Sequence, residues 1–155
     1  MEFVELIAPE SIVPNLHATS KKQALQELAR HGAALTGLGE RQIFDVLLER
    51  ERLGTTGVGS GIAIPHGKLP GLDRLYGLFA RIESPIDFDA IDEQPVDLIF
   101  MLLAPENAGA DHLKALARVS RLLGNPLLRR LPGRQCRSAY LLCFRVYIFR
   151  TQLPH

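Results

Sequence analysis

The sequence predicts an α/β domain in which helices cover both faces of a β-sheet. Three observations indicate this class. Helical and strand-like segments alternate along the chain, each helical segment has one apolar stripe, and Val96–Ala104 is almost wholly apolar, which is typical of a strand covered on both faces. The length of 155 residues fits a single domain, and a composition of 46% hydrophobic and 23% charged residues is ordinary for a soluble protein.

After residues 1–18, which mix strand-like and turn residues, the first predicted helix spans 20–32. Ser20 can cap its first turn, and Gln23 completes an S-x-x-Q capping box. Gly32 is expected just past the helix end, where glycine is favoured. The apolar stripe of this helix is formed by Leu25, Leu28 and Ala29.

The second predicted helix spans 40–54 and ends at Gly54. Its inward face is formed by Ile43, Phe44, Val46 and Leu47. The middle of the chain then alternates loops with strands. In order we expect a glycine-rich loop at 54–61, a short buried strand at 62–64, a loop at 67–73, a strand at 75–82, a turn-rich connection at 84–95, a strand at 96–104 and a loop at 105–110.

Asp111 is expected to cap a third helix in the segment "HLKALARVSRLLG". The inward side of this helix is expected to comprise Leu113, Leu116, Ala117, Ser120 and Leu123. Asn125 followed by Pro126 predicts the start of a short fourth helix.

Charge and composition exclude several classes of function. The formal net charge is +1 with no long basic run, which argues against nucleic acid as the main partner. We expect no signal peptide and no membrane insertion, because no apolar stretch has the length that a span requires. Cys136 and Cys143 form neither a CxxC pair nor a disulfide framework, which indicates a reducing cytoplasm.

The glycine-rich loop at 54–61 does not fit a nucleotide site. A Walker A loop needs four residues between its glycines and a hydroxyl after its lysine, whereas five residues separate Gly61 from Gly67 and Leu69 follows Lys68. A dinucleotide loop joins a strand to a helix, whereas this loop follows a helix and enters a strand. Close backbone approach or tight turns explain the glycines equally well.

His66 stands at the end of the strand, in "GSGIAIPHGK", and three roles are open to it. It could be structural, it could bind a metal, or it could carry a phosphoryl group, for which a pKa near neutrality suits imidazole. A metal would need further ligands, and no H-x-x-x-H or H-E-x-x-H motif occurs, so we expect neither metal nor cofactor. The remaining histidines, apart from His112, are expected at the surface: His17, His31 and His155.

Arg50 also has two interpretations when it is taken alone. It lies at the end of the second helix in "ERERLG", where a solvated charge among Glu49, Glu51 and Arg52 is the ordinary expectation. A guanidinium there could also hold phosphate oxygens through two hydrogen bonds.

The segment "RERLGTTGVGSGIAIPHGK" resembles the signature of the type 2 enzyme IIA proteins of the bacterial phosphoenolpyruvate-dependent sugar phosphotransferase system, and "PIDFDAIDEQPVDLIFMLLAP" is also similar, most of all to the nitrogen-regulatory branch. The resemblance implies a central mixed sheet with helices on both sides. It implies that His66 accepts phosphate from a histidine-containing phosphocarrier protein, with Arg50 and His112 in the active site. Loop positions near the histidine match Thr55, Thr56, Gly67 and Lys68.

The residues on either side of His66 predict how it is presented. Pro65 fixes φ before the histidine, and Gly67 is expected to let the backbone turn after it. The imidazole would then face a partner's phosphohistidine from a rigid strand.

The resemblance covers roughly Ile7 to Leu131, so we assign residues 1–131 to an enzyme IIA-like domain and 132–155 to an atypical tail. From Arg134 onward the chain has no Asp or Glu. The family usually continues there with a charged helix. The tail therefore favours an altered reading frame or a cloning artefact, with a lineage-specific strand as the alternative.

Three functional hypotheses follow. The first is a cytoplasmic phosphoryl carrier whose phosphorylation state selects regulatory protein targets, which the resemblance links to nitrogen and potassium control. The second is a sugar-specific enzyme IIA of the fructose or mannitol type. The third is a catalytically silent binding module, in which the tail displaces the helix that carries His112. The oligomeric state, the regulatory target and the role of the tail are left open by the sequence.

Overall fold

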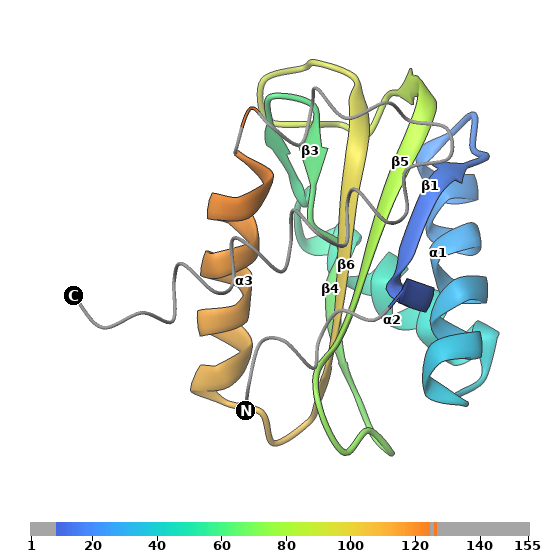
Figure 1. Ribbon diagram of the computed structural model, residues 1–155, viewed down its shortest axis with the longest axis vertical. Helices are drawn as coiled ribbons and strands as arrows, with labels where there is room; N and C mark the ends of the chain where they lie inside the picture. The colour runs from blue at the N-terminus through green and yellow to red at the C-terminus, as the bar shows by residue number, and fades with distance from the viewer. Residues whose placement is uncertain (1–8, 125, 127–155) are drawn as a thin grey trace.

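The computed structural model describes residues 9–124 and residue 126. In this range a six-stranded mixed β-sheet lies between two helices on one face and one helix on the other, as Figure 1 shows. The predicted class, a single α/β domain with helices on both faces of a mixed sheet, is confirmed. The tail at 132–155 lies outside the described residues, as does the predicted fourth helix except for residue 126, which is helical.

The elements alternate as the sequence pattern predicts. In chain order they are a short 3₁₀ turn Pro9–Ser11, β1 Ile12–Leu16, α1 Lys21–Thr36, α2 Glu40–Leu53, β2 Gly57–Gly59, β3 Ile62–Ala63, β4 His66–Leu69, β5 Tyr76–Ile86, β6 Val96–Pro105 and α3 Ala110–Leu123.

The sheet is organised around β6. The strand order is β1-β5-β6-β3-β2, and β4 also pairs with β6. Strands β3 and β4 run parallel to β6 and follow one another along the same side of it, with Ile62 opposite Leu98 and His66 opposite Leu102. Strand β5 is antiparallel to β6, and β1 is parallel to β5. His66 therefore starts a strand that is fixed along its length to β6, a strand whose residues are buried except for the half-buried Asp97.

Apolar side chains form one core on each face of the sheet. Alternation along β6 sends Phe100 and Leu102 toward α3, and Met101 and Leu103 toward α1 and α2. All four are at most 1% exposed. This explains why the sequence of β6 is a continuous apolar run.

Four local expectations are wrong. The first helix does not end at Gly32, which is buried inside α1. A Cβ at Gly32 would lie 3.1 Å from the Met101 methyl, and the helix ends at Gly37 in a left-handed conformation. Two predicted loops contain strands. The loop at 54–61 includes β2, which pairs with β3, and the loop at 67–73 begins as β4, which pairs with β6, because backbone pairing decides these conformations rather than side-chain pattern. The predicted cap Asp111 lies inside α3, whose N-cap is Gly109.

The buried face of α3 also differs from the prediction. It comprises His112, Ala115, Val119, Leu122 and Leu123. Leu113 is 67% exposed, and Ala117 and Ser120 are exposed as well. The sequence offers two stripes of similar hydropathy, offset by one residue. The stripe that packs on the sheet is the one that includes His112.

Candidate functional site

The imidazole of His66 is held by the strand from which it projects. Its Nδ1 lies 2.8 Å from the carbonyl oxygen of Ile64, and the ring is half-buried. A carbonyl oxygen can only accept a hydrogen bond, so Nδ1 carries the proton in this contact. In the neutral ring Nε2 then has the free lone pair. The local backbone thus selects the nitrogen that can act as a nucleophile.

Arg50, in the last turn of α2, contacts this same nitrogen. Its Nε donates to Nε2 of His66 at 3.3 Å, and its Nη1 donates to the carbonyl oxygen of Gly54 at 3.0 Å. The structure therefore brings Arg50 and His66 into contact. The helix end fixes one part of the guanidinium, and the rest faces the histidine.

Gly67 allows α2 to approach β4 this closely. A Cβ at this position would lie 2.3 Å from Cγ1 of Val46 on α2, well inside contact distance. The expected reason for the glycine, a backbone turn after His66, is wrong. Gly67 lies within β4 and has no left-handed φ. The position needs a glycine because a helix packs directly against the backbone there.

His112 reaches the site from the first turn of α3. Its ring centroid lies 5.4 Å from that of His66, with the two planes tilted by 54°. The residue is 7% exposed, and its Nε2 is a buried nitrogen with no hydrogen-bond partner among the residues that the structure describes. A buried polar atom without a partner is costly and calls for a functional explanation.

Burial lowers the pKa of both histidines. For His66 the nearby Arg50 charge lowers the pKa further, whereas the hydrogen bond to Ile64 and the charge of Glu51 oppose the shift. The pKa of His112 is lowered by burial first, then by His66 and by Lys68. Both rings are therefore kept neutral at pH 7, and a neutral ring is the form that can act as a nucleophile.

The other predicted positions have separate roles. Lys68 is exposed on β4, two residues beyond His66 and so on the same side of the strand, and its charge acts on His112. Thr55 Oγ1 donates to the carbonyl oxygen of Phe88 at 3.0 Å. Thr56 donates through both its backbone N–H and its hydroxyl to the carboxylate of Glu51. The two threonines thus connect the loop after α2 to neighbouring segments, Thr55 to the β5–β6 connection and Thr56 to the end of α2.

Sequence reasoning placed Glu51 among solvated charges, and this is wrong. Its side chain is 3% exposed and forms an ion pair with Lys21 at 2.8 Å. One signal was available in the sequence. A carboxylate in the last turn of a helix opposes the helix dipole, so Glu51 requires a compensating partner.

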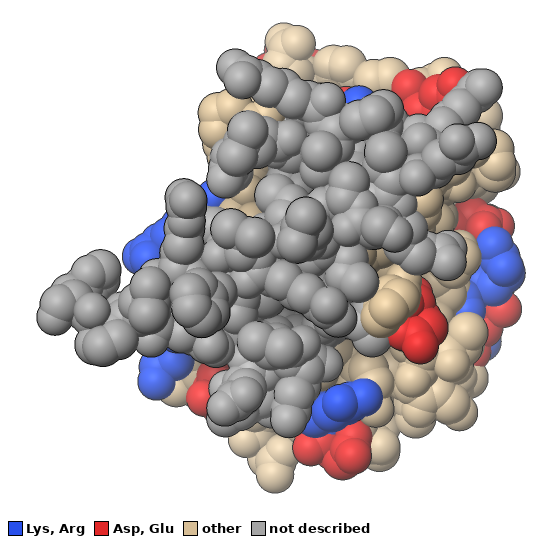
Figure 2. Space-filling view, viewed as in Figure 1, with Lys and Arg blue, Asp and Glu red and all other residues tan. Residues whose placement is uncertain are grey.

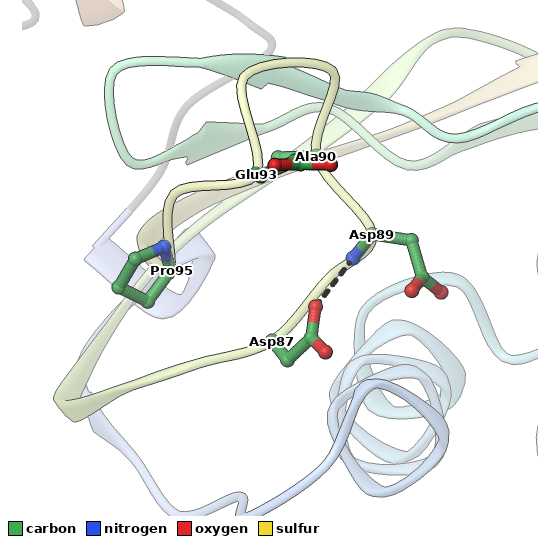
Figure 3. Close-up of a pocket in the computed structure, with 5 residues that line it drawn as sticks. All are labelled: Asp87, Asp89, Ala90, Glu93 and Pro95. Carbon is green, nitrogen blue, oxygen red and sulfur yellow. Dashed lines mark hydrogen bonds between the residues drawn. The ribbon is translucent and has the colours of Figure 1, made fainter.

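A hollow lies in the connection between β5 and β6, away from His66, and Figure 3 shows the residues that line it: Asp87, Asp89, Ala90, Glu93 and Pro95. Its volume is about 510 Å³. The backbone N–H of Asp89 donates to the Asp87 carboxylate. Three carboxylates around one hollow repel a phosphorylated group, so this pocket is a poor candidate for the reacting centre.

Charges on the surface are interspersed. On the face in Figure 2, the acidic and basic side chains that the structure describes lie next to one another around the rim. Within residues 9–124 and 126, no group of three or more His, Cys, Asp and Glu side chains is placed to hold a metal ion. None of the helices in that same part of the chain combines the length and the hydropathy needed to cross a membrane.

Comparison with known proteins identifies relatives of the whole described domain. The chain is 66% identical over 123 residues to a nitrogen regulatory protein of Bradyrhizobium diazoefficiens, covering 79% of this chain and 80% of the relative. It is 45% identical over 137 residues to the nitrogen regulatory protein of Escherichia coli K12, covering 87% and 84%. The crystal structure of nitrogen regulatory protein IIA-Ntr from Neisseria meningitidis superposes with a TM-score of 0.78 at 34% identity, covering 87% of this chain and 96% of that one.

The sequence profile of one family matches residues 5–131. That range includes the strand that begins at His66, the helix end with Arg50 and the first turn of α3 with His112. The chain therefore belongs to the EIIA type 2 family of the phosphoenolpyruvate-dependent sugar phosphotransferase system.

Proposed function

We propose that this protein is a cytoplasmic phosphoryl carrier that accepts phosphate on Nε2 of His66 from a histidine-phosphorylated carrier protein, and that its phosphorylation state acts as a regulatory signal. One observation carries the proposal. The hydrogen bond from Nδ1 to Ile64 leaves the lone pair on Nε2, and Arg50 Nε lies 3.3 Å from that same nitrogen. A nucleophile and a fixed cation thus meet at one point of the surface.

The transfer step follows from this arrangement. The Nε2 lone pair of His66 attacks the phosphorus, a new N–P bond forms, and the N–P bond of the donor histidine breaks. The electron pair of the broken bond stays on the donor ring. The proton on Nδ1 of His66 need not move, and it continues to donate to Ile64 while positive charge develops on the ring.

The neighbouring groups are suited to the phosphoryl oxygens. The Arg50 guanidinium has further N–H groups beside Nε, so it can bind these oxygens when the lone pair becomes a bond. The partnerless Nε2 of His112 supplies a hydrogen bond or, once protonated, a positive charge. Lys68 adds a second exposed cation on the same side of β4. No cofactor is needed for this step.

The regulatory role is supported by the relatives. The proteins from Bradyrhizobium diazoefficiens and Escherichia coli both carry the name nitrogen regulatory protein, and we propose the same class of output here, with nitrogen and potassium control as the field of action. A sugar-specific carrier is the rival hypothesis and would use the same chemistry. The 5.4 Å separation of the two histidine rings argues against a silent module, whose premise was a displaced α3.

The chemical part is tested by supplying phosphoenolpyruvate, enzyme I and the histidine-containing phosphocarrier protein. We expect an acid-labile phosphoryl group on the peptide that contains His66. His66→Ala should abolish it, and His31→Ala, on α1, should not. A phosphoryl group on His112 with His66 unmodified would overturn the assignment.

The regulatory part needs a separate measurement. Native protein, phosphorylated protein and His66→Ala are each used to capture partners from a cytoplasmic extract. Phosphorylation adds negative charge to a half-buried ring, so the two forms should retain different partners, and His66→Ala should match the unmodified form. The same partners for all three would leave simple onward transfer as the better account.

A further inference from the structure

Glu51 is buried where a carboxylate is least favourable. It lies in the last turn of α2, against the negative end of the helix dipole, with a side chain that is 3% exposed. Three donors satisfy it: Lys21 Nζ at 2.8 Å, the backbone N–H of Thr56 at 3.1 Å and the Thr56 hydroxyl. These donors come from α1 and from the loop that follows α2.

One side of this cluster continues to the acceptor histidine through the backbone. The carbonyl oxygen of Thr56 accepts from the N–H of Ile64 at 3.0 Å. The carbonyl oxygen of Ile64 in turn accepts from Nδ1 of His66 at 2.8 Å. A continuous series of hydrogen bonds thus connects the Glu51 carboxylate with the nitrogen whose proton selects the reactive tautomer.

The Glu51 cluster is also connected to Nε2 of His66, through the neighbouring residue Arg50. Glu51 directly follows Arg50, whose Nε donates to Nε2 of His66. The loop between α2 and β2 is held twice, by Arg50 Nη1 on the Gly54 carbonyl and by Glu51 on Thr56. Motion of Glu51 would therefore shift the guanidinium and the Ile64 carbonyl relative to one another.

We propose that Glu51 is a positioning residue for phosphoryl transfer, which acts through Thr56 and Ile64 on Nδ1 of His66 and through the α2 end on Arg50. The proposal rests on the proposed role of His66 as acceptor. It adds a residue that touches no reacting atom. This residue nevertheless determines which ring nitrogen of His66 carries the proton and where Arg50 lies relative to the other nitrogen.

The energetics of buried ion pairs favour this role over simple stabilisation. Removing two charges from water costs about as much as their attraction returns, so such a pair adds little to stability compared with apolar side chains of the same size. What it adds is a fixed geometry. The ion pair joins the last turn of α2 to the first residue of α1, and Lys21 also faces Asp89 at 3.7 Å.

The test compares two network variants with a matched control. Glu51→Gln removes the negative charge that pairs with Lys21 and replaces one carboxylate oxygen by an NH2 donor, so the Thr56 hydroxyl, which donates to Oε1, would have to accept instead. Thr56→Val removes the hydroxyl and keeps the backbone N–H. The control is Ile43→Val, which removes one methyl group from the core of the same helix, where the side chain is 0% exposed.

Two properties are measured on each variant after thermal unfolding has established that it is folded. The first is the ratio of the two neutral His66 tautomers by nitrogen NMR on the unphosphorylated protein. The second is the rate of phosphoryl transfer from the phosphorylated carrier protein. We expect Glu51→Gln to raise the Nε2–H tautomer and slow transfer about 10- to 100-fold, with Thr56→Val changing both in the same direction by less.

The Ile43→Val control should melt at a lower temperature, with both properties unchanged. Network variants that behave like this control would overturn the proposal. So would a shifted tautomer with normal transfer, or slow transfer with a normal tautomer. If Glu51→Gln does not fold, the Thr56→Val result decides. The tautomer measurement needs no phosphate, so a failure of the proposed function is recognised separately, by wild-type protein that takes no phosphoryl group on His66.

Discussion

The end of α2 and the start of α3 each bring one basic side chain to His66, and they do so in opposite ways. Arg50 is fixed by Gly54, and its neighbour Glu51 by Lys21 and Thr56. His112 comes from a helix whose N-cap, Gly109, makes no side-chain capping bond, and its Nε2 has no partner within residues 9–124 and 126.

This difference separates what is organised before a ligand arrives from what is left for the ligand to complete. On the α2 side the Glu51 carboxylate and two of the Arg50 nitrogens already have partners, so this side can hold the acceptor nitrogen and the guanidinium without rearrangement. The α3 side keeps a buried polar atom unsatisfied, at a cost to stability. We infer that the α2 side determines the geometry of transfer and that the α3 side contributes once phosphate is present.

Among the variants considered, replacement of Arg50 on the α2 side should have the largest effect on the rate of phosphoryl transfer. Arg50→Ala should slow phosphoryl transfer about 100-fold, because a fixed charge on the developing phosphoryl oxygens is lost. Arg50→Lys should slow it about tenfold, since the ammonium retains the charge without the planar fork. The measurement is single-turnover transfer from the phosphorylated carrier protein.

Arg52→Ala provides the control, because Arg52 is an exposed cation at the same helix end. Its transfer rate should equal that of wild type, and all three variants should melt near the wild-type temperature. If Arg50→Ala also transferred at the wild-type rate, Arg50 would be an ordinary solvated charge.

Gly67 tests how closely α2 must pack against β4. Gly67→Ala places a methyl group 2.3 Å from Val46 Cγ1, and we expect a loss of about 2 kcal/mol in the free energy of unfolding. Transfer should slow as well, because α2 carries Arg50. Chemical denaturation measures the first effect.

The double variant Val46→Ala/Gly67→Ala should recover part of the lost stability, since it removes the clashing atom. Gly124→Ala is the control, because its added methyl group would have its nearest neighbour at an ordinary 3.5 Å. An alanine at 67 that costs no more than one at 124 would refute the packing argument.

The α2 side also shows what the sequence could and could not predict. Amphipathic periodicity predicts α1 and α2, and the apolar run predicts β6, because these signals are local in the sequence. The ion pair between Glu51 and Lys21 joins two helices, and nothing local distinguishes Glu51 from the exposed Glu49. The unfavourable position of a carboxylate in the last turn of a helix suggests that a partner is needed, but it does not identify Lys21 as that partner.

The structural roles of individual glycines were harder to predict than the helices and strands around them. Gly32 and Gly67 were assigned to a helix end and a turn, as their neighbours in sequence indicate. Both are instead sites of close packing, against Met101 and Val46. Such contacts depend on which elements meet in space. The expected gathering of His66, Arg50 and His112 came from the family resemblance and not from spacing, because the three lie on a strand and two different helices.

The α3 side should respond less strongly. His112→Leu should raise the free energy of unfolding by about 1 kcal/mol, since it removes a buried nitrogen without a partner. It should slow transfer about tenfold, less than Arg50→Ala, because a neutral ring donates a weaker hydrogen bond than a guanidinium. Thermal melts and single-turnover transfer measure the two effects on the same samples.

His112→Gln retains a donor and should keep more of the transfer rate than His112→Leu, with less gain in stability. If His112→Leu lowered stability and left transfer unchanged, the ring would be a packing residue. The comparison between the two sides of the site would then have to be abandoned.

The smallest expected effect is the change of stability and transfer rate with pH. It sharpens the comparison between the α2 and α3 sides of the site, because charged groups on both sides contribute to it. Burial lowers the pKa of His66 and of His112 below the ordinary 6.5, with Arg50 acting on the first and Lys68 on the second. Below pH 6.5 the unfolded chain therefore binds more protons than the folded protein. The stability contributed by the neutral rings is complete above about pH 6.5 and is lost as pH falls through the lowered pKa values.

Ring titration by NMR should give midpoints below 6.5 for both histidines, and transfer should decline as pH falls through the midpoint of His66, since the protonated ring has no lone pair. The rings contact each other, so the two midpoints belong to the pair. Arg50→Ala should raise the lower of the two titration midpoints, because the Arg50 charge disfavours the protonated ring. Glu51→Gln should lower it further, because the Glu51 carboxylate favours the protonated ring. If the lower midpoint of the pair lay at or above 6.5, this would contradict the claim that the α2 side holds the acceptor neutral. The rate advantage of that side would then have to come from Arg50 alone.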